Sequence, residues 1–137
     1  MKFGIVKPRT REGYTVECET LRDAELVAEL DPGAVDHGVV ADGIGIVVYE
    51  FGLFVPPVDQ SYFAIGGRLY AGNAVLYGFH EDGETADLVR LPQISMLSDY
   101  RAVERAIAER RIVRPEMSVN GKVMWQWPSA APAGMKR

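Results

Sequence analysis

The stretch from residue 66 to residue 78, GGRLYAGNAVLYG, combines four glycines with an arginine and an asparagine, so phosphate binding is the first chemistry to test. A phosphate-binding loop needs a Gly-Lys-Ser/Thr ending and a helix behind it, so that backbone N–H groups converge on the anion. Here Gly66-Gly67 is followed by Arg68 and a strand-like apolar run. The pattern therefore predicts a bend at Gly66-Gly67, a central strand over 69–77 with a bulge or close approach at Gly72-Asn73, and an exit turn at Gly78.

A ligand site along the same stretch is the alternative interpretation. Tyrosine rings can stack on a base, and a guanidinium can bind an anion. The side chains that would form such a small-molecule or nucleotide site are Arg68, Tyr70, Asn73 and Tyr77.

Other residue types that could support catalysis or metal binding lack a coherent spacing. His37 and His80 lie in separate turn-like segments, without the His or Cys pairs that make a metal site predictable. Cys18 occupies an alternating apolar position, where an inert buried thiol is expected. The serines lack a nucleophile-elbow context. We therefore predict no catalytic residue, no metal ligand and no cofactor, although the many carboxylates leave acid–base chemistry open.

Charge is strongly segregated along the chain. The net charge is −4, but residues 12–87 carry fifteen acids against only Arg22 and Arg68, whereas both ends are basic. Such a segment would attract a basic protein surface and repel nucleic acid. Alternatively, the basic ends fold back over the acidic middle and neutralise it. The acids predicted to form a partner-binding surface are Glu17, Asp23, Glu25, Glu29, Asp31, Asp36 and Glu50.

The arginines between 101 and 114 could contact nucleic acid, with a tryptophan stacking nearby. Arg101 and Arg105 share a helix face, but Arg110 and Arg111 diverge from it. A solvated face or a charge-complementary dimer contact explains them better, and direct nucleic-acid binding is not expected.

Length and composition indicate a single folded domain. The chain has 137 residues, 47% of them hydrophobic and 25% charged, and no apolar run approaches the ~18 residues of a membrane span. The basic start of the chain does not fit an export signal, and a single cysteine fits a reducing cytoplasm. We expect one domain over 1–128 and a flexible tail over 129–137.

Periodicity and turn signals predict an α+β fold with a mostly antiparallel twisted sheet. One helix is expected over about 20–30, capped by Thr20. Its apolar, core-facing side consists of Leu21, Ala24, Val27 and Ala28, widened by Leu26 and Leu30. A second helix is expected over 98–111, capped by Ser98. Asp42-Gly43 and Asn120-Gly121 are typical of two-residue type I′ hairpin turns. Other expected strands lie near 53–55, before Pro56-Pro57, and near 85–91 after the turn at Asp82-Gly83.

The C-terminal hairpin predicts an apolar patch. In a two-residue turn Val123, Trp125 and Trp127 would share one face, which the rest of the protein or a partner must cover. Trp125 and Trp127 are therefore candidates for a homodimer interface.

The order of features over residues 1–90 resembles a family of small proteins of unknown function found in phages and plasmids. The resemblance rests on the capped helix near 20–30, Asp42-Gly43 before IGIVVYE, Pro56-Pro57, AGNAVLYG and HEDGETADL. Val58 stands where the family has an asparagine, and DQSYFAIGG looks inserted. The resemblance implies a mobile-element setting and no catalytic residues. The leading hypothesis is a non-enzymatic accessory or counter-defence factor that binds a basic host protein.

Overall fold

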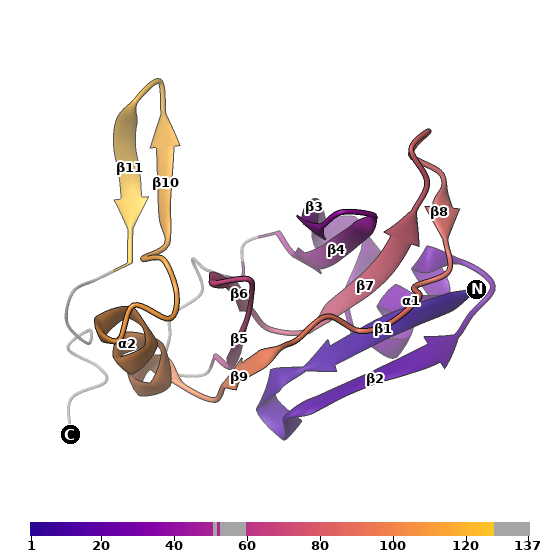
Figure 1. The fold of residues 1–137 in the computed structure, drawn as a ribbon, viewed down its shortest axis with the longest axis horizontal. Coiled ribbons are helices and arrows are strands. Elements are labelled where there is room, and N and C mark those ends of the chain that lie inside the picture. The colour runs from indigo at the N-terminus through magenta and orange to yellow at the C-terminus, as the bar shows by residue number, and fades with distance from the viewer. Residues whose placement is uncertain (51, 53–59, 128–137) are drawn as a thin grey trace.

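The computed structural model describes residues 1–50, 52 and 60–127, and these form two antiparallel sheets, a separate hairpin and two α-helices (Figure 1). The expected α+β class, both helices and the C-terminal hairpin are confirmed. The strand expected near 53–55, Pro56-Pro57 and the tail over 129–137 lie outside the described residues.

All strands of the larger sheet come from the N-terminal two-thirds of the chain. Its strands run in the order β2-β1-β7-β4-β3, and a short β8 pairs with the end of β7. All of these pairs are antiparallel. The bounds are β1 Lys2–Lys7, β2 Glu12–Glu17, β3 Val35–Ala41, β4 Ile44–Tyr49, β7 Ala74–Phe79 and β8 Thr85–Ala86, with 3₁₀ turns η1 Pro8–Thr10 and η2 Pro32–Ala34.

The smaller sheet has the order β6-β5-β9, and the hairpin β10–β11 stands apart from both sheets (Figure 1). The bounds are β5 Tyr62–Ile65, β6 Arg68–Ala71, β9 Ser95–Leu97, β10 Glu116–Val119 and β11 Lys122–Gln126. The helices are α1 Leu21–Val27 and α2 Tyr100–Ala108. Figure 1 shows α2 and the hairpin at one end of the molecule and the larger sheet at the other.

Three apolar clusters join these elements into four layers. Ala24 and Ala28 of α1 pack on Phe3, Ile5 and Val75, on one face of the larger sheet. The opposite face of that sheet packs against the smaller sheet. The outer face of the smaller sheet is covered by α2, whose buried side chains are Tyr100, Val103 and Ala106. The layer order is therefore α1, larger sheet, smaller sheet, α2.

Helix α1 begins where the sequence predicts and ends earlier. The Thr20 hydroxyl accepts a hydrogen bond from the Asp23 N–H at 3.1 Å, which caps the helix. The helix ends at Val27 instead of continuing to residue 30, because Glu29 adopts a left-handed backbone with φ of 61°. The N–H groups of Glu29 and Leu30 then bond back to the carbonyls of Leu26 and Glu25, which closes the helix.

The start of α2 differs from the predicted one by a residue. The cap is Asp99, whose carboxylate accepts from the Ala102 N–H at 2.9 Å, so the assignment of Ser98 as the cap is wrong. Aspartate and serine are about equally good caps, so residue type does not decide between them. Asp99 is the cap because it has an extended backbone and directly precedes Tyr100, the first helical residue. The helix ends at Ala108, and Arg110 adopts the left-handed conformation with φ of 59°.

The predicted single strand over 69–77 is two strands in different sheets. Gly66 and Gly67 have φ of 59° and 80° and form a tight turn that joins β5 to β6, so they are more than a bend. The chain then leaves the smaller sheet at Gly72-Asn73 and enters the larger one as β7. The exit turn predicted at Gly78 is also wrong: Gly78 lies within β7, where a Cβ would meet the Asp87 carbonyl oxygen at 2.4 Å.

Of the two predicted type I′ turns, only one has both residues at positive φ. Asn120 and Gly121 have φ of 52° and 78°, as that turn requires. At Asp42-Gly43 only Gly43 has a positive φ, and the register of β3 and β4 shifts between Val39 and Ala41. The hairpin is present there, but it is closed by a bulged turn.

Candidate functional site

The acids predicted to form one partner-binding surface are divided between faces of the larger sheet. Asp23, Glu29 and Asp31 lie on or just after α1 and are exposed. Strand alternation places Glu17 on the opposite face, since its neighbour Val16 packs with the α1 cluster. Asp36 and Glu50 line a cavity between the sheets at the β3 edge. The predicted surface therefore reduces to a smaller acidic group around α1.

Glu25 belongs to the interior face of α1. Its side chain is only 6% exposed. Burial raises the pKa of this carboxyl, while His37 and Arg22 nearby lower it. A buried carboxylate offers little to an approaching partner, so Glu25 is not part of the exposed acidic group.

The exposed side of α1 carries apolar residues that the sequence reasoning assigned to the core. Leu26 is 59% exposed and Val27 is 37% exposed. The signal was available in the sequence: at 3.6 residues per turn, Leu26 lies about 200° around the helix from Ala24, which is buried. Exposed carboxylates lie on this helix and just beyond both of its ends, and Arg22, one turn before Leu26, is the exposed base on it. The carboxylates are Glu19, Asp23, Glu29 and Asp31.

Two further exposed apolar residues lie on the same face of the larger sheet. Tyr49 follows Val47 by two residues in β4, and Val47 packs with the α1 cluster. Val39 lies two residues after His37 in β3. The centre of the His37 ring lies 6.4 Å from the centre of the Tyr77 ring, and Tyr77 packs against that cluster. By alternation Tyr49 and Val39 point to the α1 side, where they are exposed. We call Leu26, Val27, Val39, Tyr49 and the four exposed carboxylates on and around α1 the α1 face.

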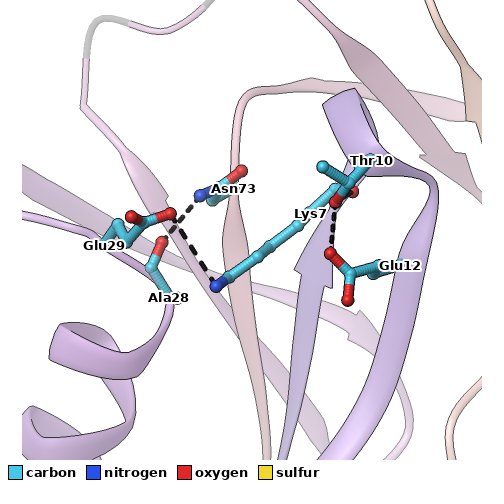
Figure 2. A network of polar contacts seen from close by, with 6 residues as sticks. All are labelled: Lys7, Thr10, Glu12, Ala28, Glu29 and Asn73. Carbon is cyan, nitrogen blue, oxygen red and sulfur yellow. Dashed lines mark hydrogen bonds and ion pairs between the residues drawn. The ribbon is translucent and has the colours of Figure 1, made fainter.

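The C-terminal end of α1 is fixed to the sheet by polar contacts (Figure 2). The Asn73 side-chain amide donates to the Ala28 carbonyl at 2.8 Å. The Lys7 ammonium lies 3.7 Å from the Glu29 carboxylate. Asn73, predicted as a ligand-binding residue, therefore has an anchoring role, because it satisfies a carbonyl that the end of the helix leaves unpaired.

Tyr77, another of the predicted ligand residues, also packs within the fold. Its ring lies across Gly45, its cross-strand partner in β4, where a Cβ would approach the ring to 2.2 Å. It points to the α1 side of the larger sheet, away from Arg68. The structure therefore separates Asn73 and Tyr77 from the other two predicted ligand residues.

Arg68 and Tyr70 do lie together. Both are in β6 and face the larger sheet, and the Arg68 guanidinium carbon lies 5.7 Å from the centre of the Tyr70 ring. They line a cavity of about 160 Å³ with Asp36 and Glu50. Burial raises the pKa of the Tyr70 hydroxyl above its ordinary value, and the positive charge of Arg68 offsets only part of this rise. The sequence predicted Arg68 and Tyr70 as ligand residues but did not place Asp36 of β3 and Glu50, just after β4, beside them.

The two tryptophans differ in their surroundings. Trp127 is 2% exposed, stacks on Tyr100 at 4.9 Å between ring centres, and meets Tyr62 edge-on at 5.4 Å. Its indole N–H donates to Glu104 at 3.2 Å. Trp125 is half-buried against the same cluster. Trp127 is thus covered by its own chain and is unavailable to a second copy, whereas Val119, Val123 and Met124 of the hairpin are exposed.

The basic ends neutralise part of the acidic middle. The N-terminal ammonium lies 3.6 Å from Glu17, and Lys7 pairs with Glu29. In the basic C-terminal segment, Arg111 pairs with Glu109 of the same segment at 2.8 Å. Five arginines lie in α2 or in the segment just after it, at the end of the molecule opposite the larger sheet (Figure 1): Arg101, Arg105, Arg110, Arg111 and Arg114.

Cys18 is half-buried beside the α1 cluster, and burial raises the pKa of its thiol, to which Asp23 adds. Among the described residues, no group of three or more His, Cys, Asp or Glu side chains is arranged to hold a metal ion. Nor does any helix in the described part of the chain have the length and apolar character needed to cross a membrane. Comparisons with protein-family models, with curated proteins and with solved structures find no match to this chain.

Proposed function

We propose that this chain is a non-enzymatic protein-binding factor that uses the α1 face to engage a basic protein. One observation carries the proposal: Leu26 and Val27 are exposed on a helix whose flanks carry four exposed carboxylates. Apolar side chains at the centre of a patch with a polar rim are typical of protein interfaces. A partner of this chemistry presents a small apolar surface ringed by lysine or arginine.

The charge distribution supports the same proposal. The exposed acids around α1 exceed the single exposed base Arg22, and Lys7 is the basic residue that pairs with one of them. Complementary charge of this kind accelerates association and fixes orientation, while the apolar contact contributes affinity. The resemblance of residues 1–90 to phage and plasmid proteins supports a mobile-element setting, in which the partner is a host protein and the chain an accessory or counter-defence factor.

Leu26→Ser tests the apolar part of the α1 face. The chain is immobilised and exposed to bacterial lysate, and Val89→Ser, which changes a side chain that is 92% exposed elsewhere, serves as the matched control. We expect Leu26→Ser to lose the partner that the wild type and Val89→Ser retain, with folding unchanged by circular dichroism. Retention of the same partner by all three proteins would contradict the proposal.

Charge reversal tests the acidic part. Glu19→Lys with Asp23→Lys changes the α1 face, and Glu81→Lys with Glu84→Lys makes the same charge change on the exposed β7–β8 turn. Only the first pair should weaken capture, and capture by the wild type should fall between about 50 mM and about 300 mM salt, because screening shortens the range of exposed charges. Equal loss with both pairs would mean that only net charge matters.

A small-molecule site is the second candidate function. It is favoured by the juxtaposition of Arg68 and Tyr70 in a cavity between the sheets. Asp36 and Glu50 in the same cavity oppose binding of a phosphate there, since two carboxylates face one guanidinium. A thermal-shift screen against nucleotides, repeated with Arg68→Ala, tests this candidate. If a nucleotide raised the melting temperature of the variant as much as that of the wild type, Arg68 would not be part of the binding site.

A further inference from the structure

A second cavity that Arg68 also lines is formed by the β5–β6 turn and the segment that links α2 to β10. Its volume is about 420 Å³, within the range of small-molecule sites. Residues 66–69 form one wall and residues 113–116 the other. These two segments are far apart in the sequence, so only the tertiary fold creates this cavity.

Backbone hydrogen bonds hold both walls in place. The Val113 N–H donates to the Gly67 carbonyl at 2.9 Å, which ties the linker to the glycine turn. The Trp127 N–H donates to the Pro115 carbonyl at 2.9 Å, and the Arg114 guanidinium donates to the Trp127 carbonyl at 2.7 Å. The linker is thereby attached to the buried Trp127, and a ligand would meet a wall that is already ordered.

The cavity is locally positive in an acidic protein. Arg68 and Arg114 line it with a single carboxylate, Glu116. The Arg68 guanidinium carbon lies 5.7 Å from the centre of the Tyr70 ring, and the Arg114 guanidinium donates to the Trp127 carbonyl, so a ligand would use their remaining donors. Arg68 is one of only two bases between residues 12 and 87. A guanidinium presents a planar fork of donors that matches the oxygens of a carboxylate or a phosphate. The remaining side chains in its lining are apolar: Leu69, Val113 and Pro115.

We propose that this cavity binds a small molecule with an apolar body and a carboxylate or phosphate group, which Arg68 and Arg114 hold from opposite walls. The apolar body lies against Leu69 and Pro115, and Glu116 lies at the same wall as Arg114, where it can accept a hydrogen bond from a donor on the ligand. This inference takes up the small-molecule candidate at a different cavity and does not depend on the α1 face.

Three probes separate the parts of the proposal: phenyl phosphate carries both features, phenol lacks the anion, and inorganic phosphate lacks the apolar body. Binding is followed by the ¹⁵N-labelled amide signals of Gly66, Gly67 and Val113 in the full chain. We expect saturable shifts with phenyl phosphate at a Kd of about 1 mM or below, and weaker binding of the other two.

Arg68→Ala should weaken phenyl phosphate binding at least about tenfold, and Arg68→Lys less, because a charged hydrogen bond is lost in the first and a point charge is kept in the second. Arg101→Ala, an exposed arginine of α2, is the matched control and should bind like the wild type. Leu26→Ser should also bind like the wild type, which keeps this test separate from that of the α1 face.

The proposal is overturned if phenyl phosphate produces no saturable shift at these amides, or if Arg68→Ala binds as tightly as Arg101→Ala. If phenol bound as tightly as phenyl phosphate, the anionic group would not contribute to binding. If inorganic phosphate bound as tightly as phenyl phosphate, the apolar body would not contribute. Either result contradicts the ligand class as stated.

Discussion

The two helices are built alike and packed differently. Each begins with a side-chain cap, Thr20 or Asp99, and each is followed, two residues after its end, by a non-glycine residue in the left-handed conformation, Glu29 or Arg110. In α2 the apolar residues Tyr100, Val103 and Ala106 are buried against the smaller sheet. In α1 the buried residues are Ala24 and Glu25, Leu21 is half-buried against the sheet, and Leu26 and Val27 are exposed.

This difference separates a structural helix from a candidate interface. The apolar surface of α2 is already covered by the smaller sheet and by Trp127, so α2 has little to offer a partner through that surface. Helix α1 rests on the sheet through Ala24 and Ala28 and depends on Asn73 and Lys7 to fix its end. Leu26 and Val27 are left exposed. Four predictions, from the largest expected effect to the smallest, test whether the helices differ in this way.

Trp127→Ala should have the largest effect, because it removes the ring that stacks on Tyr100 of α2. We expect the free energy of unfolding to fall by about 3–5 kcal/mol, as for other buried aromatic side chains. Urea titration measures it. Trp125→Ala is the control, with a smaller loss because Trp125 is only half-buried. Equal losses for the two would show that Trp127 has no special role in holding α2.

Asn73→Ala should destabilise α1 alone. It leaves the Ala28 carbonyl without the amide that it accepts from, at a cost of about 1–3 kcal/mol. Hydrogen exchange should become faster at the α1 amides and stay unchanged at those of α2. Gln93→Ala, which removes an exposed amide, is the comparison, and the same exchange pattern in both variants would argue against the anchoring role.

The caps should matter about equally in both helices. Thr20→Ala and Asp99→Ala each remove an acceptor for a first-turn N–H, and each should cost about 1 kcal/mol of unfolding free energy. Ser98→Ala should stay within about 0.5 kcal/mol of the wild type, as expected of an exposed residue outside the cap. A larger loss in Ser98→Ala than in Asp99→Ala would reverse the assignment of the α2 cap.

Glu25→Gln should have the smallest effect and the clearest pH dependence. Because burial raises the pKa of Glu25 in the folded state, its charged form opposes folding at neutral pH, and this penalty disappears as the pH falls below the unfolded pKa near 4.5. The variant should therefore gain stability over the wild type at pH 7 and less at pH 4, by urea titration. Glu81→Gln removes a charge from an exposed turn and controls for net charge. A gain that is larger at pH 4 would contradict the burial argument.

Local chemistry predicted much of the fold. Thr20 as a cap, the turn at Asn120-Gly121 and the two helices are present because each depends on neighbouring residues. Strand β5 was missed, since YFAI is a short apolar run without alternation and resembles any buried segment. Its partners, β6 and β9, are recognisable as a sheet only after the chain has folded back.

The candidate sites were harder to predict than the fold. Arg68 and Tyr70 were proposed together and do lie together, because they are two residues apart in one strand. Asn73 and Tyr77 lie apart from Arg68 and Tyr70, because the chain passes from the smaller sheet to the larger one at Gly72-Asn73. The pairing of Arg68 with Arg114 across a cavity has no signal in the sequence, as the residues are brought together by the contact between Val113 and Gly67.

By itself, the sequence determined what depends on short range: the fold class, the capped start of α1, the hairpin turns and the segregation of charge. Only the tertiary structure decided which apolar residues are covered. Trp127 was available to a partner by its sequence and is buried by α2, whereas Leu26 was assigned to the core and is exposed. The physical reason is that burial depends on which elements pack against a side chain, and those elements come from distant parts of the chain.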